Sequence, residues 1–68
     1  MNETTVRDIQ NQLRFLSEDF DTIDPIAVDG IYGEETQRAV AELQRILGFD
    51  ATGEADERTL NALNDLYR

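Results

Sequence analysis

The sequence has no cysteine and no histidine among its 68 residues. Disulfide bonds are therefore excluded, and so are metal sites built from thiolate or imidazole ligands and catalysis by a cysteine or a histidine. A chain of this length has room for one small domain. We expect that domain to span residues 1–68, with its core between about residue 5 and residue 67.

Positive charge and long apolar runs are scarce as well. Six arginines and no lysine stand against fifteen acidic residues, which gives a net charge of −9. Because phosphate backbones and anionic lipids repel such a surface, we expect no nucleic-acid partner and no attraction to a membrane surface. No apolar run approaches the ~20 residues of a membrane span, and no apolar signal-peptide region follows Met1, so we expect no membrane insertion. A chain that begins in this way can be a whole protein or an excised module.

What the sequence does contain is three stretches with apolar residues at helical spacing, which predict an all-α, compact three-helix bundle. Thr4 or Thr5 can cap the first helix, Gly48 followed by Phe49 is typical of a left-handed cap that ends the second, and Asp56 suits the N-cap of the third. The apolar positions are Val6, Ile9, Leu13 and Leu16 in the first stretch, Ala39, Val40, Leu43, Ile46 and Leu47 in the second, and Leu60, Leu63 and Leu66 in the third.

The connection from Ser17 to Ile31 has no helical periodicity. A loop of this length needs packing of its own in a compact domain, and the apolar residues within it predict that it is held against the core. Its acidic residues lack the D-x-D-x-D-G register and the bidentate glutamate of a calcium-binding EF-hand, so we expect a solvated loop and no metal site, with weak divalent binding left open. The apolar residues are Phe20, Ile23, Ile26 and Val28, and the acids are Glu18, Asp19, Asp21, Asp24 and Asp29.

An internal repeat is the most informative pattern. A shift of 23 residues places Gly30 on Gly53, Thr36 on Thr59 and Val40 on Leu63, and it places Gly33 on Asp56. Each copy therefore has a glycine turn, a cap, a threonine and an apolar helical stripe. Two such copies predict a duplicated turn–helix element and not a solenoid, which needs at least three repeats.

Several ordered motifs carry a resemblance to a known family. The segments VRDIQNQLRFL, DGIYGEETQRAVAELQ and LGFDATGEADERTLNAL together resemble the peptidoglycan-binding domain family, the small three-helix modules attached to cell-wall hydrolases. The resemblance runs from about Val6 to Leu63. The matching residues are Ile9, Gln10, Leu13, Asp29, Gly30, Tyr32, Gly33, Thr36, Ala39, Val40, Gln44, Gly48, Phe49, Gly53, Thr59 and Leu63.

The resemblance implies a non-catalytic module that binds peptidoglycan or muropeptide fragments and anchors a linked hydrolase or a wall or spore protein. It also implies an extracytoplasmic location, associated with the cell wall or the spore, and no cofactor. The alternative is a docking domain of the same fold that binds another protein, or another domain of its own chain, without binding the wall. The charge of −9 favours the alternative, whereas the full set of motifs favours wall binding.

The glycine turn DGIYGEET, residues 29–36, raises the question of a ligand cradle. It lacks the third glycine, the lysine and the preceding strand of a phosphate-binding loop, and Glu34 and Glu35 would repel an anion at the helix start. We therefore interpret Gly30 as a positive-φ turn and Gly33 as a helix cap. Thr36 and Thr59 are expected to bond back to the turns, and Gln10 and Gln44 to bridge turn backbones with buried amides.

Three residues are candidates for ligand contact: Tyr32, Thr36 and Arg58. Tyr32 can pack its ring while its hydroxyl reaches solvent, and the Arg58 guanidinium can hold a carboxylate in a bidentate fork, although it can equally pair with Glu54 or Glu57. Tyr67 can cover the end of the bundle, and we expect no surface stripe of sugar-stacking aromatic rings. We expect no catalytic residue, because adjacent glutamates on a helix point about 100° apart and so small a bundle offers no deep cleft.

Overall fold

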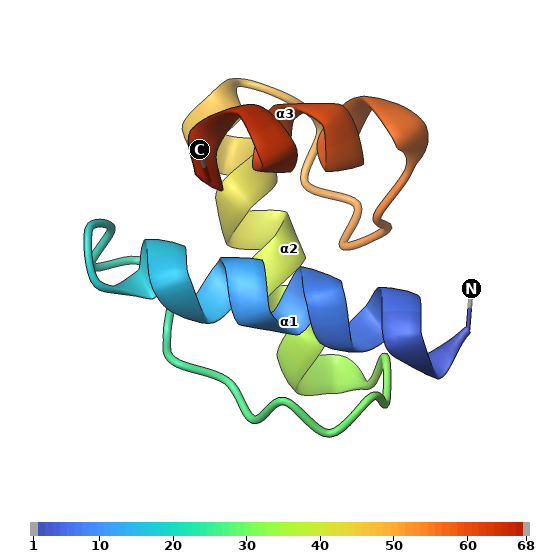
Figure 1. Cartoon of the computed structure of the whole chain (residues 1–68). Helices are drawn as coiled ribbons and strands as arrows, with labels where there is room; N and C mark the ends of the chain where they lie inside the picture. The colour runs from blue at the N-terminus through green and yellow to red at the C-terminus, as the bar shows by residue number, and fades with distance from the viewer. Residues whose placement is uncertain (1, 68) are drawn as a thin grey trace.

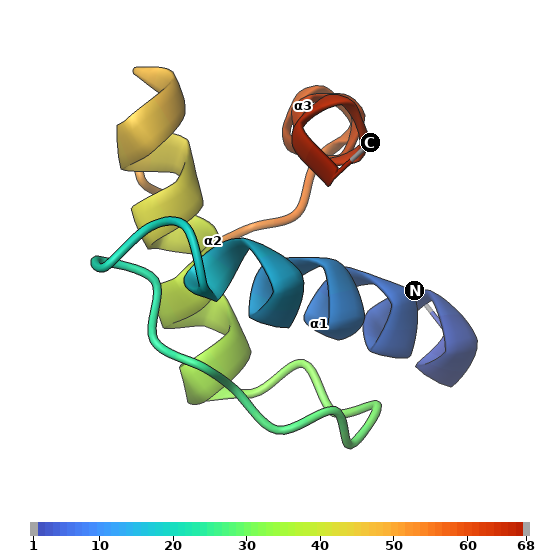
Figure 2. The ribbon, with the colours of Figure 1, turned by 60° about the vertical axis from the view of Figure 1, so that its left-hand side comes forward.

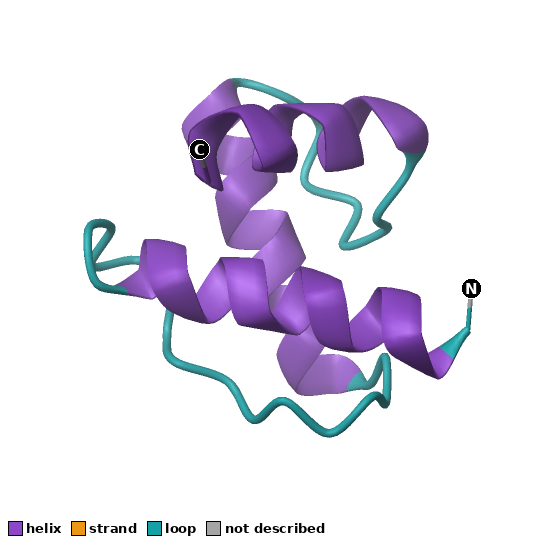
Figure 3. Cartoon of the chain, in the orientation of Figure 1, coloured by secondary structure: helices purple, strands orange, loops and turns teal. Residues whose placement is uncertain are grey.

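The computed structural model describes residues 2–67, which form three helices and no strand. The helices are α1 (Glu3–Ser17), α2 (Glu34–Leu47) and α3 (Glu57–Tyr67), and loops form the connections between them (Figures 1 and 3). In Figure 1, α2 passes behind α1 and α3 lies across the top. Figure 2 shows α3 nearly end-on, beside the C-terminal half of α2 and above α1. The prediction of an all-α three-helix fold is confirmed.

Helix α1 begins earlier than the sequence pattern predicts. Asn2 is its N-cap, with the side-chain oxygen accepting a hydrogen bond of 2.8 Å from the backbone N–H of Thr5. The expectation that Thr4 or Thr5 caps this helix is therefore wrong, because an asparagine further upstream already satisfies a free N–H of the first turn. The apolar face is as predicted, since Val6, Ile9, Leu13 and Leu16 are all buried.

Helix α2 is bounded by glycines at both ends. Gly33 is the N-cap in an extended conformation, and Gly48 ends the helix at φ 78°. The N–H of Gly48 bonds to the Arg45 carbonyl and the N–H of Phe49 to the Gln44 carbonyl, the pair of bonds that closes a Schellman motif. Both caps are confirmed.

The apolar face of α2 is narrower than its sequence pattern indicates. Ala39, Val40 and Leu43 are buried, but Leu47 is only half-buried and Ile46 is 39% exposed. The sequence places Ile46 on the same apolar face as the other four residues, but its side chain is not buried. Gln44 in the last turn is buried and Leu47 packs against the core, so Ile46 lies at the edge of the buried face of α2.

Asp56 directly precedes α3, and its carboxylate accepts a hydrogen bond of 2.9 Å from the N–H of Thr59. The predicted N-cap is thus confirmed. Leu63 is buried and Leu60 half-buried, but Leu66, on the same apolar stripe, is 38% exposed.

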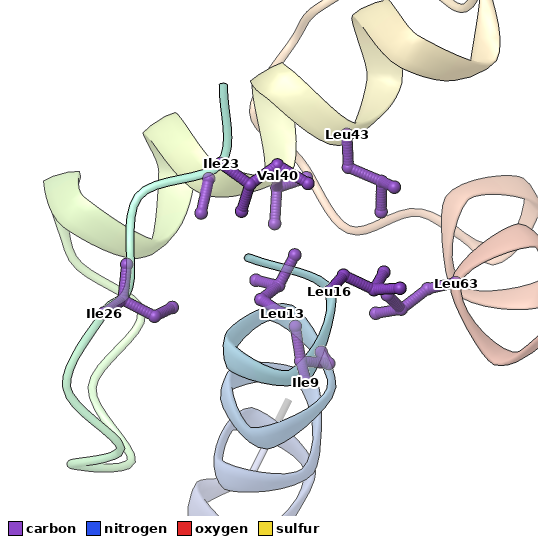
Figure 4. Packing of buried hydrophobic residues seen from close by; sticks show 9 residues of the cluster. Ile9, Leu13, Leu16, Ile23, Ile26, Val40, Leu43 and Leu63 are labelled. Atoms are coloured by element: carbon purple, nitrogen blue, oxygen red, sulfur yellow. The ribbon is translucent and has the colours of Figure 1, made fainter. Parts of the chain in front are cut away.

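The core receives side chains from all three helices and from the long connection between α1 and α2. Ile23 and Ile26 in that connection are 1% and 4% exposed and pack with Leu13 and Val40 (Figure 4). The prediction that the connection is held by its apolar residues is confirmed. The full cluster consists of Ile9, Leu13, Leu16, Ile23, Ile26, Ala39, Val40, Leu43 and Leu63.

Candidate functional site

A buried glutamine organises the glycine turn before α2. The Gln10 carbonyl oxygen accepts hydrogen bonds from the backbone N–H groups of Asp29 (3.1 Å) and Gly30 (2.9 Å). Its amide nitrogen donates to the Asp29 carboxylate, to the Ile31 carbonyl and to the Thr36 hydroxyl, each at 3.0 Å. One side chain on α1 therefore fixes both the turn and the first turn of α2.

A second glutamine does the same for the turn before α3. The Gln44 carbonyl oxygen accepts from the N–H of Gly53 at 3.0 Å. Its amide nitrogen donates to the Thr52 hydroxyl (3.3 Å), the Glu54 carbonyl (2.9 Å) and the Thr59 hydroxyl (3.0 Å). We call each of these networks a glutamine cage. The predicted bridging role of both glutamines is confirmed.

The two cages correspond position by position, which supports the duplication inferred from the sequence. Gly30 and Gly53 both have φ 77°. Asp29 in the first turn and Thr52 in the second each accept one bond from the glutamine amide and one from the backbone N–H two residues further on. The copies differ in spacing, because the glutamine precedes its glycine by 20 residues in the first and by 9 in the second.

The second turn needs glycine for two reasons. Its positive φ is a conformation that residues with a Cβ adopt only at a cost. A Cβ on Gly53 would in addition lie 3.1 Å from the backbone oxygen of Gln37, so α2 blocks a larger residue there. The glycine turn thus serves close packing of the chain, as the sequence indicates.

Tyr32 joins the two cages. Its ring is half-buried, and its hydroxyl donates a hydrogen bond of 2.7 Å to the carbonyl of Gly53. Burial raises the pKa of Tyr32 to about 12. The hydroxyl that the sequence analysis expects at the solvent is therefore engaged in holding the second turn against the first.

The other two candidate residues have different surroundings. Thr36 is 2% exposed, and its hydroxyl lies inside the first cage, where it also lies 3.4 Å from the Ile31 carbonyl oxygen. Arg58 is exposed on the first turn of α3, with its guanidinium carbon 3.8 Å from the centre of the Phe49 ring. Within residues 2–67, Arg58 forms no ion pair with Glu54 or Glu57. Its charge instead lies over an aromatic face, a cation–π contact.

Two carboxyl groups at the turns have shifted pKa values. Hydrogen bonds from the Ile31 backbone and from Gln10 lower the pKa of Asp29, and hydrogen bonds at Thr59 lower the pKa of Asp56. A general acid needs a raised pKa near the working pH. These two carboxylates are thus suited to capping turns and helices and unsuited to proton donation at neutral pH.

An aromatic pair that sequence reasoning missed lies at the other end of the molecule. Phe15 and Tyr67 are 49% and 42% exposed, and their ring centres are 5.1 Å apart at an angle of 69°. The expectation that the surface has no aromatic stripe thus overlooks a pair of rings. Phe15 falls outside the apolar stripe of α1, and a large aromatic residue on the polar face of a helix is the signal that could have found it.

Further surface features concern ions and membranes. In the part of the chain that the structure describes, no group of three or more acidic side chains is placed to hold a metal ion. None of the helices within residues 2–67 is both long and apolar enough to cross a membrane.

The fold and the two cages define a small all-α module with a duplicated turn–helix unit. A family model described as "Putative peptidoglycan binding domain" matches residues 2–63. The match covers most of the chain, so this chain belongs to that family. Comparison with curated proteins and with solved structures finds no match.

Proposed function

We propose that this domain binds peptidoglycan and anchors a linked cell-wall hydrolase or a wall or spore protein outside the cytoplasm. The observation that carries the proposal is the family match over residues 2–63. The cages support it, because their internal hydrogen bonds hold the backbone turns at the starts of α2 and α3. A preformed surface loses less entropy on binding than a flexible one.

On that surface, Tyr32 and Arg58 are the proposed contact residues. Arg58 is exposed and can offer its guanidinium edge to a stem-peptide carboxylate while its face stays on Phe49. Tyr32 offers the exposed part of its ring. Thr36 is buried, so in this proposal it acts through the first cage by holding the turn that carries Tyr32.

The experiment is sedimentation of the purified domain with insoluble peptidoglycan sacculi, with and without attached anionic polymers, at low and moderate salt. We expect the domain to sediment, and to do so best when salt screens the repulsion between its net charge of −9 and anionic wall polymers. Absence of sedimentation with every type of sacculus would overturn the proposal in favour of a protein-docking domain.

A matched pair of variants locates the contact. Arg58→Gln should reduce the sedimented fraction. Arg45→Gln removes the same charge from the exposed last turn of α2, where Arg45 pairs with Glu42, and should leave the fraction unchanged. Equal effects of the two variants would show that net charge governs binding and that Arg58 makes no specific contact.

A further inference from the structure

The exposed rings of Phe15 and Tyr67 form one wall of an open hollow of about 700 Å³. The C-terminal ends of α1 and α3, which carry the two rings, lie on the same side of the molecule (Figure 1). The Gly30 turn lies elsewhere, beside Glu3 and Arg7 at the start of α1. The hollow is therefore separate from the surface that carries Tyr32 and Arg58, and its volume falls within the range of about 300–1,000 Å³ that small-ligand sites occupy.

Polar side chains complete the lining. Amides come from Asn11 and Gln12, and Pro25 of the long connection adds a further apolar surface. Gln12 donates a hydrogen bond of 2.9 Å to the Asn64 side-chain oxygen, which connects α1 and α3 beside the rings. The bond leaves the carbonyl oxygen of Gln12 to accept from a ligand, and the Asn11 amide can both donate and accept.

This combination matches the chemistry of a sugar ring. A pyranose presents C–H groups on its faces and hydroxyl groups around its edge. The negative face of an aromatic ring attracts the polarised C–H groups, and amides can both donate to and accept from hydroxyl and N-acetyl groups.

Charge selects among the parts of peptidoglycan. Among the residues that the structure describes, the charged groups lining the hollow are the carboxylates of Asp8 and Glu18 and the guanidinium of Arg14, on a chain whose net charge is −9. A stem peptide ending in a carboxylate is repelled by such a site, whereas an uncharged N-acetylated sugar is not.

We propose that the hollow walled by Phe15 and Tyr67 binds an N-acetylated sugar ring of the glycan strand. This inference rests on the proposed function, which it deepens by assigning the glycan to one surface and leaving the stem peptide to the other. Phe15 and Tyr67 are the stacking residues, and Asn11 and Gln12 are the hydrogen-bonding residues.

The test is a ¹H–¹⁵N NMR titration with two probes, an uncharged chitooligosaccharide and a sugar-free stem peptide. The oligosaccharide should produce saturable shifts centred on Phe15 and Tyr67. Shifts centred on Tyr32 and Arg58, or no shift at all, would overturn the assignment of sugar to this hollow. A response of the hollow to the stem peptide alone would overturn it as well.

Variants sharpen the result. Phe15→Ala and Tyr67→Ala should each weaken oligosaccharide binding about tenfold, the upper range for loss of one aromatic contact, while Tyr67→Phe, which keeps the ring, should bind nearly as the parent. Ile31→Ala is the matched control, because Ile31 is a 67% exposed apolar residue outside the hollow. Circular dichroism checks that every variant is folded. Equal affinities of Phe15→Ala, Tyr67→Ala and Ile31→Ala would overturn the inference.

Sedimentation with sacculi separates this inference from the proposed function. If the parent and the two alanine variants sediment equally and the oligosaccharide causes no NMR shifts, the assignment of the sugar site is wrong and the proposed function stands. If the parent binds the oligosaccharide at the hollow but never sediments with sacculi, the sugar site stands and the proposed wall anchoring is wrong.

Discussion

Gln10 and Gln44 each combine a donor and an acceptor at the end of one side chain, and both turns depend on this combination. A turn presents backbone N–H groups pointing one way and carbonyl groups pointing another, and each must find a partner when it is buried. The oxygen of the glutamine amide accepts from the backbone N–H groups, and its nitrogen donates to the backbone carbonyl groups. A glutamate of the same length could accept from the N–H groups but could not donate to the carbonyls while ionised.

At the same scale, Tyr32 gives a prediction about alkaline pH. Its pKa is raised to about 12 from an ordinary 10.0, with burial as the main cause. The folded state therefore keeps its proton while the unfolded state loses it, so stability is fully present below pH 10 and falls as the pH rises towards 12. In the Tyr67→Phe variant, which leaves Tyr32 as the remaining tyrosine, near-ultraviolet absorbance should show ionisation near pH 12, accompanied by loss of helical circular dichroism.

The Tyr32→Phe variant is the control for this titration. It removes the ionisable group together with the hydrogen bond to Gly53, so it should be less stable at neutral pH and lose less stability between pH 10 and pH 12. An absorbance midpoint near pH 10 in Tyr67→Phe, with the helices intact, would contradict the statement that burial raises the pKa of Tyr32.

At the scale of the element, α2 gives a prediction about the width of its buried face. Leu43 is fully buried, whereas Ile46, one turn further on, is 39% exposed. Leu43→Ala should cost about 2–5 kcal/mol through lost burial and the cavity left behind, most of the margin of so small a domain. Ile46→Ala should cost no more than about 1 kcal/mol, because its side chain already meets solvent.

Urea unfolding followed by circular dichroism measures both costs. Similar losses in the two variants would show that Ile46 is as buried as Leu43, against the structure. Unchanged stability in Leu43→Ala would show that α2 presents another face to the core.

The helices themselves were predictable from the sequence, since the 3.6-residue period is a local property of the chain. The caps at Gly33, Gly48 and Asp56 were predictable for the same reason, because capping depends on residues within one turn. The first cap at Asn2 was not, since a run of polar residues before an apolar stripe offers several candidates with the same chemistry.

The exposure of individual apolar residues and the contact between the two surface rings could not be predicted from the helical period. Ile46 and Leu66 follow the helical period but are 39% and 38% exposed, and the period does not encode how far round each helix its partners reach. Phe15 and Tyr67 lie far apart in the sequence, so their contact can be found only when α1 and α3 are placed side by side.

At the scale of the whole molecule, the net charge of −9 acts against the compact state. Within residues 2–67, three ion pairs form, Glu3–Arg7, Glu34–Arg38 and Glu42–Arg45, and each lies at the surface, where such pairs contribute little. Most acids are therefore uncompensated and repel one another, which favours the unfolded chain.

This repulsion predicts that salt stabilises the domain. Raising the concentration of sodium chloride from about 10 mM to about 150 mM shortens the screening length from about 30 Å to about 8 Å, so the melting temperature should rise. Potassium chloride should give the same increase, because screening depends on ionic strength and not on the cation. A melting temperature that falls with salt would show that the surface ion pairs outweigh the repulsion.

The unequal spacing of the two cages has a consequence for the order in which the chain can assemble. Closing the second cage joins residues 9 positions apart, and closing the first joins residues 20 positions apart. This roughly twofold difference in loop length makes the second closure cheaper in chain entropy by about 0.6 kcal/mol. We therefore expect the second cage to close before the first, which is completed when Gln10 of α1 reaches the turn that carries Tyr32.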